Sequence, residues 1–383
     1  SARAAEVIKE AGYTAVPADC SSTVRRGSPK VLATSANSAL ASVVFPVEVP
    51  PATRMFRRSA TARASQAARA GAWPSASQRR RQSNRRHIRR MAIASGSGAG
   101  REKFLAGAVS FAGSDSAMKD EEADKAKEVC GDQGAFHVPA YVSPIAIAYN
   151  LPSVKEDIKM DAETVAKVFS GEIKKWNDDA IASQNEGVEL PDTDITVVHR
   201  SDKSGTTKNF VSYLSEAAPE NWKHEPEDVW PIKGGEAAKG TSGVVDTIGA
   251  GEGNIGYADA SQIGDLKAAK IKAGEEFIEY SPDAAAKILE SAKRVDESSK
   301  TNYAVKLDRG NAGEGVYPVV LVSYAVACTD YEDKDVASTV KAYLEYAVSE
   351  DGQKASTDAA GSAGLSEAAT KNATDALGQI KTD

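Results

Sequence analysis

Residues 196–214 read TVVHRSDKSGTTKNFVSYL and predict a short strand, a turn and a helix. The β-branched run from Thr196 to Val198 predicts the strand, which brings Arg200 to the turn. Apolar side chains then recur at helical spacing from Phe210 to Leu214, and Ser204 stands where such a helix begins. A strand, a turn and a helix in direct succession are typical of a layered α/β fold.

The start of this predicted helix has the chemistry of an oxyanion clamp. Ser204, Gly205 and Thr206 open the helix, whose first N–H groups are unpaired and carry a partial positive charge. Arg200 adds a planar fork of donors that can grip two oxygens of one anion, and Asp202 is close enough in sequence to hold the guanidinium. The alternative is a capped helix with no ligand, since capping alone explains the hydroxyls.

A second feature lies about a hundred residues earlier. The glycine-rich run from Gly96 to Gly100 contains Ser97 and precedes a predicted short helix, Arg101 to Leu105, and then a strand that ends at Asp115. A carboxylate beside an anion repels it unless the anion carries a proton to share. Because phosphate keeps a proton near neutral pH and sulfate does not, Asp115 predicts discrimination in favour of phosphate.

These segments resemble the ligand loops of the phosphate-binding proteins that serve phosphate-specific ABC importers, most closely those of high-GC Gram-positive bacteria. The likeness covers about residues 95–383. It extends to VFSGEIKKWN at residues 168–177, GNIGY at 253–257 and AGLS at 363–366. The resemblance implies an α/β periplasmic-binding-protein fold of type II, with two lobes, a hinge and a central cleft. Lobe 1 would comprise residues 95–140 and 312–383, and lobe 2 residues 141–311.

The resemblance also implies the site and the function. The expected phosphate contacts are Ser97, Asp115, Arg200, Ser204, Gly205 and Thr206, with Asp202 supporting Arg200. The expected function is high-affinity capture of inorganic phosphate and its delivery to a membrane permease by a monomer that is not an enzyme and uses no cofactor or metal. A second helix start lies at the end of the glycine-rich loop 234–243 and contains Thr241 and Ser242, which either cap that helix or face the cleft.

Charge is distributed unevenly along the chain. Residues 1–100 carry 17 Lys and Arg against 4 Asp and Glu, a net charge of +13. Because the whole chain has a net charge of −7, residues 101–383 carry −20. Capture of an anion by this acidic part must come from local dipoles and Arg200, and its charge argues against nucleic-acid binding. Of the three cysteines, Cys130 and Cys328 are expected in the same lobe and predict a disulfide, as in an exported protein; the alternative is two unrelated buried thiols.

Residues 1–94 do not resemble the family. They include twelve Arg between Arg54 and Arg90, and no acid lies between Glu48 and Glu102. This composition fits either a basic arm that binds RNA or a membrane surface, or a poorly ordered segment. It also fits coding DNA read out of frame, in which case the family's first ligand loop would be missing. The family predicts an extracellular, lipid-anchored protein, but neither a signal peptide nor a lipidation site at Cys20 is visible.

Several further elements are expected from periodicity. The predicted helices are 117–129, 161–169, 335–348 and 366–380; the predicted strands are 137–150, 255–258 and 317–327, with a hairpin or strand at 271–280.

Three other functions fit parts of the sequence less well. The glycine run with Asp115 is superficially like a dinucleotide fingerprint, but its third glycine comes one residue early. The four histidines lack metal-ligand spacing, which makes a phosphate-ester hydrolase a minor alternative. A receptor for another tetrahedral oxyanion such as sulfate is the nearest alternative.

Overall fold

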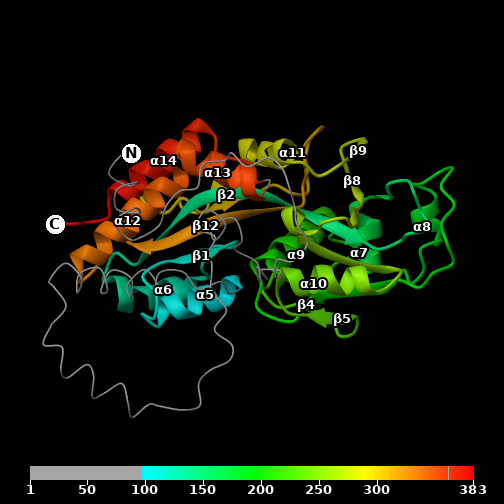
Figure 1. The fold of residues 1–383 in the computed structure, drawn as a ribbon, viewed down its shortest axis with the longest axis horizontal. Coiled ribbons are helices and arrows are strands. Elements are labelled where there is room, and N and C mark those ends of the chain that lie inside the picture. Colours follow the sequence, from blue (N-terminus) through cyan, green and yellow to red (C-terminus); the bar gives the residue numbers. More distant parts are fainter. Residues whose placement is uncertain (1–95, 361) are drawn as a thin grey trace, which may run out of the picture.

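The computed structural model describes residues 96–360 and 362–383 (Figure 1). The predictions for residues 1–94, including the arginine-rich run and Cys20, fall outside this part of the chain. The described residues form two groups of elements, which we call the α5 lobe and the α9 lobe. The α5 lobe contains α5 (Ser97–Leu105), α6 (Asp120–Cys130) and the C-terminal helices; the α9 lobe contains α9 (Gly205–Ala217) and α10 (Gly240–Ala250).

One seven-stranded sheet runs through both lobes, in the order β1-β12-β2-β6-β4-β5, with β7 (Lys267–Ala268) also on β2. Strand β2 (Ala135–Tyr149) pairs antiparallel with β12 (Val320–Cys328) from Ala135 to Pro144. From Ile145 onward the same strand pairs with β6 (Asn254–Asp259). The near-continuous apolar run predicted as a buried strand is therefore the strand that passes from one lobe to the other.

The ends of this sheet carry the segments that were singled out in the sequence. Strand β1 (Ala112–Ser114) pairs antiparallel with β12 at one edge. At the other edge β4 (Thr196–Arg200) lies parallel between β6 and β5 (Glu236–Ala238). Parallel β4 and β6 are connected through α9 and α10, as in a βαβ unit.

The remaining elements complete the two lobes. The α9 lobe also contains a small sheet in the order β3-β8-β9, and a two-stranded sheet pairs β10 with β11. Their bounds are β3 Lys159–Met160, α7 Ala162–Ser170, α8 Asp179–Ala182, η1 Ala260–Gln262, β8 Lys270–Ala273, β9 Glu276–Ile278, α11 Pro282–Ala286, η2 Lys287–Ser291, β10 Lys293–Arg294, β11 Val305–Lys306, α12 Lys334–Val348, α13 Glu350–Ala360 and α14 Glu367–Gly378.

Capping side chains fix where several helices begin. Ser204 accepts the N–H of Thr207 at the start of α9, and Asp161 accepts that of Thr164 at the start of α7. Ser281 does the same for α11, which has Pro282 in its first turn. The starts of α9 and α7 agree with those expected from the sequence.

Aromatic side chains fill the core of the α9 lobe. Trp230 lies against Phe169, Phe210 and Tyr257, with ring centroids 5.6–6.3 Å apart. Trp176 is fully buried and its indole N–H donates to the Gly253 carbonyl at 3.0 Å, so it is a core residue. This packing holds α9 against the sheet and thereby fixes the position of its N-terminus.

Cys130 and Cys328 are joined by a disulfide, with Cα atoms 5.1 Å apart. The bond connects the end of α6 to the end of β12, and both cysteines belong to a small apolar core with Phe104 and Val326. It therefore lies within the α5 lobe.

Candidate anion-binding site

Arg200 is buried at the end of β4 and is held by Asp202. Its Nε donates to Asp202 Oδ1 and its Nη2 to Asp202 Oδ2, both at 2.7 Å. The Gly240 N–H also donates to Asp202, at 3.1 Å. Burial alone would raise the pKa of the Asp202 carboxyl, but Arg200 and Gly240 outweigh burial and lower it. Nη1 of Arg200 has no hydrogen-bond partner among the described residues, so one side of the guanidinium is left for another acceptor.

The start of α9 follows this pair directly. Ser204, Gly205 and Thr206 are all buried, and Gly205 is the first residue of the helix. The first N–H groups of a helix have no intrahelical partner, so this buried turn is a place where backbone donors and an anion can meet.

Ser97 and Asp115 form the other half of the site. Ser97 is the first residue of α5; its hydroxyl donates to Asp115 Oδ2 at 3.2 Å and accepts the Asp115 N–H at 3.1 Å. Asp115 follows β1, is buried, and its Oδ1 has no hydrogen-bond partner among the described residues. The hydroxyl of Ser323 on β12 also lies near this carboxyl, without hydrogen-bond geometry.

Burial raises the pKa of the Asp115 carboxyl to about 7. The nearby Ser323 hydroxyl lowers that pKa, the charge of Asp259 raises it, and Ser97 and the charge of Arg200 lower it. The carboxyl can therefore exchange a proton with a bound group near neutral pH.

Two glycines show how closely the halves approach each other. A Cβ on Gly205 would lie 2.7 Å from Ser97 Oγ and 2.8 Å from Asp115 Cβ. A Cβ on Gly96 would lie 2.6 Å from the Lys203 carbonyl oxygen. The structure thus brings the predicted residues of both loops together, and only glycine allows that approach at these two positions.

Three further polar residues lie near these groups: Thr241 follows Gly240, Asn209 is on α9, and Ser323 is on β12. Thr241, in the first turn of α10, is buried and its hydroxyl has no partner among the described residues, whereas Ser242 is partly exposed. Asn209 donates from Nδ2 to the carbonyl oxygens of Asp115 at 2.6 Å and Gly205 at 2.9 Å. Ser323 was missed, although a lone hydroxyl inside the apolar run of β12 was a usable signal.

The histidines of the described residues have structural partners. His199 stacks on Trp230 with ring centroids 5.5 Å apart, and His137 accepts the Met118 N–H at 3.0 Å while burial lowers its pKa to about 4. In the part of the chain that the structure describes, no group of three or more His, Cys, Asp or Glu could hold a metal ion.

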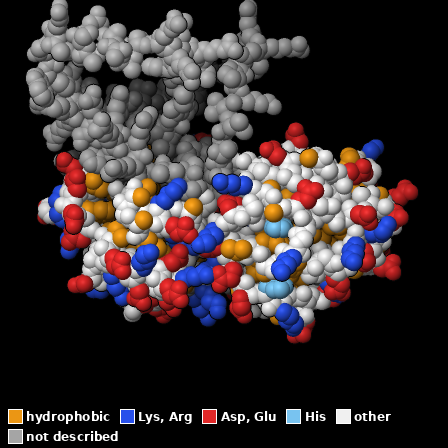
Figure 2. All heavy atoms as spheres, turned by 90° about the horizontal axis from the view of Figure 1, so that it is seen from below, with side chains coloured by type: hydrophobic (Ala, Val, Ile, Leu, Met, Phe, Trp, Pro, Cys, Tyr) orange, Lys and Arg blue, Asp and Glu red, His pale blue; other side chains and the backbone are white. Residues whose placement is uncertain are grey.

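No helix of the described residues has the length and apolar character that crossing a membrane requires. Figure 2 shows acidic and basic side chains interspersed on one face of the molecule.

Two lobes joined by long sheet strands, with a polar site formed by segments of both, define a solute-binding protein of the two-lobed type. Residues 58–351 match the model of the PBP superfamily domain. That range includes residues 58–94, which lie outside the likeness expected from the motifs. The chain belongs to this superfamily and, within it, to the family of PstS phosphate-binding proteins, as the following relatives show.

The chain is 37% identical over 256 residues to phosphate-binding protein PstS 3 of Mycobacterium leprae (strain TN), covering 66% of this chain and 69% of that protein. It is 32% identical over 260 residues to phosphate-binding protein PstS of Pasteurella multocida (strain Pm70), covering 66% and 72%. The resemblance expected from the sequence motifs is therefore confirmed.

Solved structures agree on the fold. A phosphate-binding protein from Stenotrophomonas maltophilia superposes with a TM-score of 0.60 at 20% identity, covering 79% of this chain and 89% of that one. A high-affinity periplasmic phosphate-binding protein (PfluDING) bound with phosphate gives a TM-score of 0.59 at 20% identity, covering 73% and 85%. The expected two-lobe α/β fold is confirmed.

Proposed function

We propose that this protein captures inorganic phosphate with high affinity and delivers it to the membrane permease of an ABC importer. The observation that carries the proposal is a matched pair of unused groups. Arg200 Nη1 is a buried donor and Asp115 Oδ1 a buried acceptor, and neither has a partner among the described residues. Unpaired buried polar groups are costly, so a donor and an acceptor of this kind in one site support a ligand position there. The relatives named phosphate-binding proteins support phosphate as that ligand.

Each group has a distinct role in this proposal. Arg200, held by Asp202, donates from Nη1 to one phosphate oxygen, while the N-terminal turn of α9 donates to others. The Ser97 hydroxyl has a single O–H, which would turn from Asp115 Oδ2 to a phosphate oxygen when the ligand binds. Asp115 accepts the proton that phosphate retains near neutral pH. Thr241 is a further candidate donor, because its hydroxyl is buried and unpaired.

Lobe closure is the conformational step that we propose. Residues 95–140 with 312–383 would move against residues 141–311, because ligand contacts from both lobes exist together only in the closed form. The closed form would then dock on the permease as a monomer at the outer face of the membrane, with a lipid anchor. We also propose that the protein is not an enzyme and does not bind nucleic acid.

Calorimetric titrations with phosphate, sulfate and ATP test the proposal. We expect saturable binding of phosphate, weak or absent binding of sulfate, and no binding of ATP. Binding of sulfate as tight as that of phosphate would favour a general oxyanion receptor, and binding of ATP alone would contradict the proposal.

Arg200→Lys locates the site. Lysine cannot make the paired hydrogen bonds to Asp202 and also present a fixed donor, so phosphate binding should weaken by about 1–3 kcal/mol. Lys203→Met is the control, because Lys203 is an exposed neighbour that pairs with Glu102. Unchanged affinity in Arg200→Lys would place the phosphate elsewhere.

A further inference from the structure

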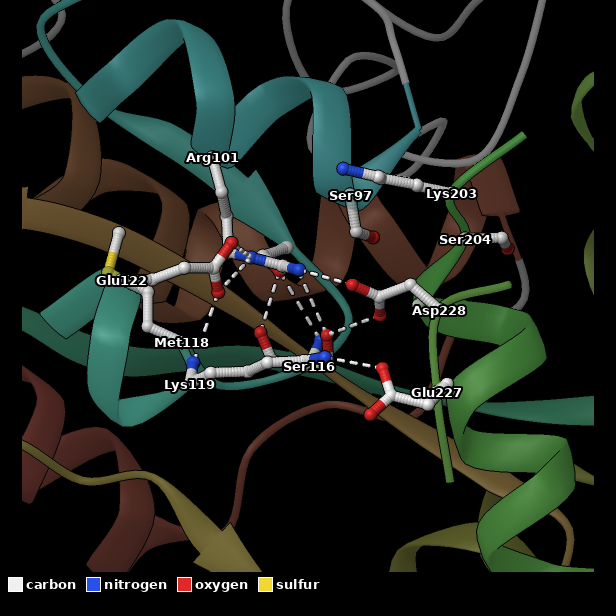
Figure 3. A network of polar contacts seen from close by, with 12 residues as sticks. Ser97, Arg101, Ser116, Met118, Lys119, Glu122, Lys203, Ser204, Glu227 and Asp228 are labelled. Carbon is white, nitrogen blue, oxygen red and sulfur yellow. Dashed lines mark hydrogen bonds and ion pairs between the residues drawn. The ribbon is translucent and has the colours of Figure 1, made fainter. Parts of the chain in front are cut away.

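Arg101 lies at the centre of a buried polar network next to the proposed phosphate site (Figure 3). Its side chain is 1% exposed. Nε donates to the Glu122 carboxylate at 3.0 and 3.1 Å, and Nη1 donates to the hydroxyls of Ser114 at 2.9 Å and Ser116 at 3.0 Å. Nη2 forms an ion pair with Asp228. All three nitrogens of the guanidinium therefore have partners, and none is left for a ligand of its own.

On one side this network controls the chain around Asp115. Ser114 and Ser116 are the neighbours of Asp115 in sequence, so Arg101 holds the side chains on both sides of the proposed proton acceptor. The Ser114 hydroxyl in turn donates to the Ser116 carbonyl at 2.6 Å. The direction in which the Asp115 carboxyl points thus depends on Arg101.

On the other side the network reaches the start of α9. Asp228, in the segment between α9 and β5, accepts the Ser204 N–H on its main-chain oxygen at 2.8 Å. Ser204 is the residue that caps α9. Arg101 consequently connects Asp115 to the helix N-terminus that faces the same ligand.

The Arg101–Asp228 pair also crosses from the α5 lobe to the α9 lobe. Glu122, by contrast, stays on α6 in the same lobe as Arg101. Two further ion pairs cross beside it, Lys203–Glu102 at 2.6 Å and Lys119–Glu227. Those side chains are between 43% and 58% exposed, whereas Asp228 is 8% exposed. Exposed pairs contribute little, so Arg101–Asp228 is the pair able to couple the lobes.

We propose that Arg101 is a positioning residue for phosphate binding, whose ion pair with Asp228 forms as the lobes close and sets Asp115 and the start of α9 for the ligand. The inference rests on the proposed phosphate function. In an open form Arg101 keeps Glu122 as its partner while Asp228 is hydrated, so neither charge is buried alone. Closure then brings Asp228 to the guanidinium, and by linkage phosphate and this pair stabilise each other.

Two matched variants test the proposal, because Arg101 has one carboxylate partner in each lobe. Asp228→Asn and Glu122→Gln each remove one negative charge from the same guanidinium and keep the side chain's size. We expect Asp228→Asn to weaken phosphate binding about 10- to 100-fold and to leave the melting temperature of the phosphate-free protein nearly unchanged. Glu122→Gln should lower that melting temperature and change phosphate affinity less than threefold.

Arg101→Lys provides a second measurement that does not depend on Asp228→Asn folding well. Lysine keeps the charge but cannot hold Ser114, Ser116 and Asp228 together, so the preference for phosphate over sulfate should shrink along with affinity. A purely structural role would lower stability and leave that preference unchanged.

The outcomes separate this inference from the function on which it rests. Wild-type protein that binds no phosphate would overturn the proposed function and the inference with it. Wild-type binding, combined with equal losses of affinity in Asp228→Asn and Glu122→Gln, would overturn the inference alone. A drop in the phosphate-free melting temperature of Asp228→Asn with unchanged affinity would also overturn it.

Discussion

Asp115 is the residue on which selectivity depends. In Asp115→Asn the amide can donate to an unprotonated sulfate oxygen, which the carboxylate could only repel. We expect phosphate binding to weaken and sulfate binding to strengthen, so that discrimination narrows by about 1–3 kcal/mol, the usual effect of an unsatisfied buried polar group. Competition calorimetry at pH 8 measures both affinities.

Asp202→Asn is the matched control for this prediction. Asp202 is also a carboxylate of the site, but it contacts Arg200 and Gly240 and has no unpaired oxygen of its own to offer. Its loss should weaken phosphate and sulfate alike. Discrimination that stays unchanged in Asp115→Asn would remove the proton-acceptor role.

The raised pKa of Asp115 also predicts how the stability of the phosphate-free protein depends on pH. The unfolded carboxyl titrates near 3.8 and the folded one near 7, so the folded state holds the proton more tightly. This contribution to stability is fully present below pH 3.8 and is lost as the pH rises to about 7. Because asparagine cannot ionise, Asp115→Asn should have a higher free energy of unfolding than the wild type at pH 8, by at most about 4 kcal/mol. This difference should be smaller at pH 5.

Urea unfolding of both proteins at pH 5 and pH 8 measures this difference in the free energy of unfolding. His137 acts in the opposite direction, because its pKa is lowered to about 4 and stability is lost as the pH falls below 6.5. Since His137 is present in both proteins, its effect cancels in the difference. The same difference in the free energy of unfolding at both pH values would contradict the raised pKa of Asp115.

At the scale of the element, the start of α9 depends on the absence of a side chain at Gly205. In Gly205→Ala the new Cβ would meet Ser97 Oγ at 2.7 Å and Asp115 Cβ at 2.8 Å, and both are tightly packed. The two loops must then move apart, so phosphate affinity should fall at least tenfold. Gly243→Ala in α10 is the control: its Cβ would come no closer than 3.7 Å, and a helical Gly→Ala change stabilises by about 0.5–1 kcal/mol. Equal phosphate affinities in the two variants would show that the close approach is unimportant.

Local signals predicted most elements well. The β-branched run before Arg200 and the hydroxyl at Ser204 both act within a few residues, which is why β4 and α9 begin where the sequence indicated. Strand β4 extends two residues beyond the predicted run because His199 and Arg200 pair with Ala237 and Ala238 of β5. Helix α13 was not predicted, since its residues, including Gly352, are small or polar and show weak periodicity.

Contacts between distant residues limited the prediction of the site. Ser97, Asp115 and Arg200 were found because each stands at the end of an element, where a ligand can be reached. Arg101 was passed over, because its partner Asp228 lies 127 residues away and nothing near either residue indicates the other. Such pairs are set by the packing of the two lobes, which a single sequence does not reveal.

At the scale of the whole molecule, the disulfide should stabilise one lobe and leave ligand binding unaffected. Cys130 and Cys328 are 198 residues apart in sequence, so their bond closes a long loop, and removing such a bond costs about 2–5 kcal/mol. Both cysteines lie in the small core with Phe104 rather than beside Arg200 or Asp115. The double variant Cys130→Ala, Cys328→Ala should therefore melt at a lower temperature, while its phosphate affinity at 15 °C stays within threefold of wild type. Loss of affinity without a change in melting temperature would mean that the bond acts on the cleft, and not on the stability of the α5 lobe.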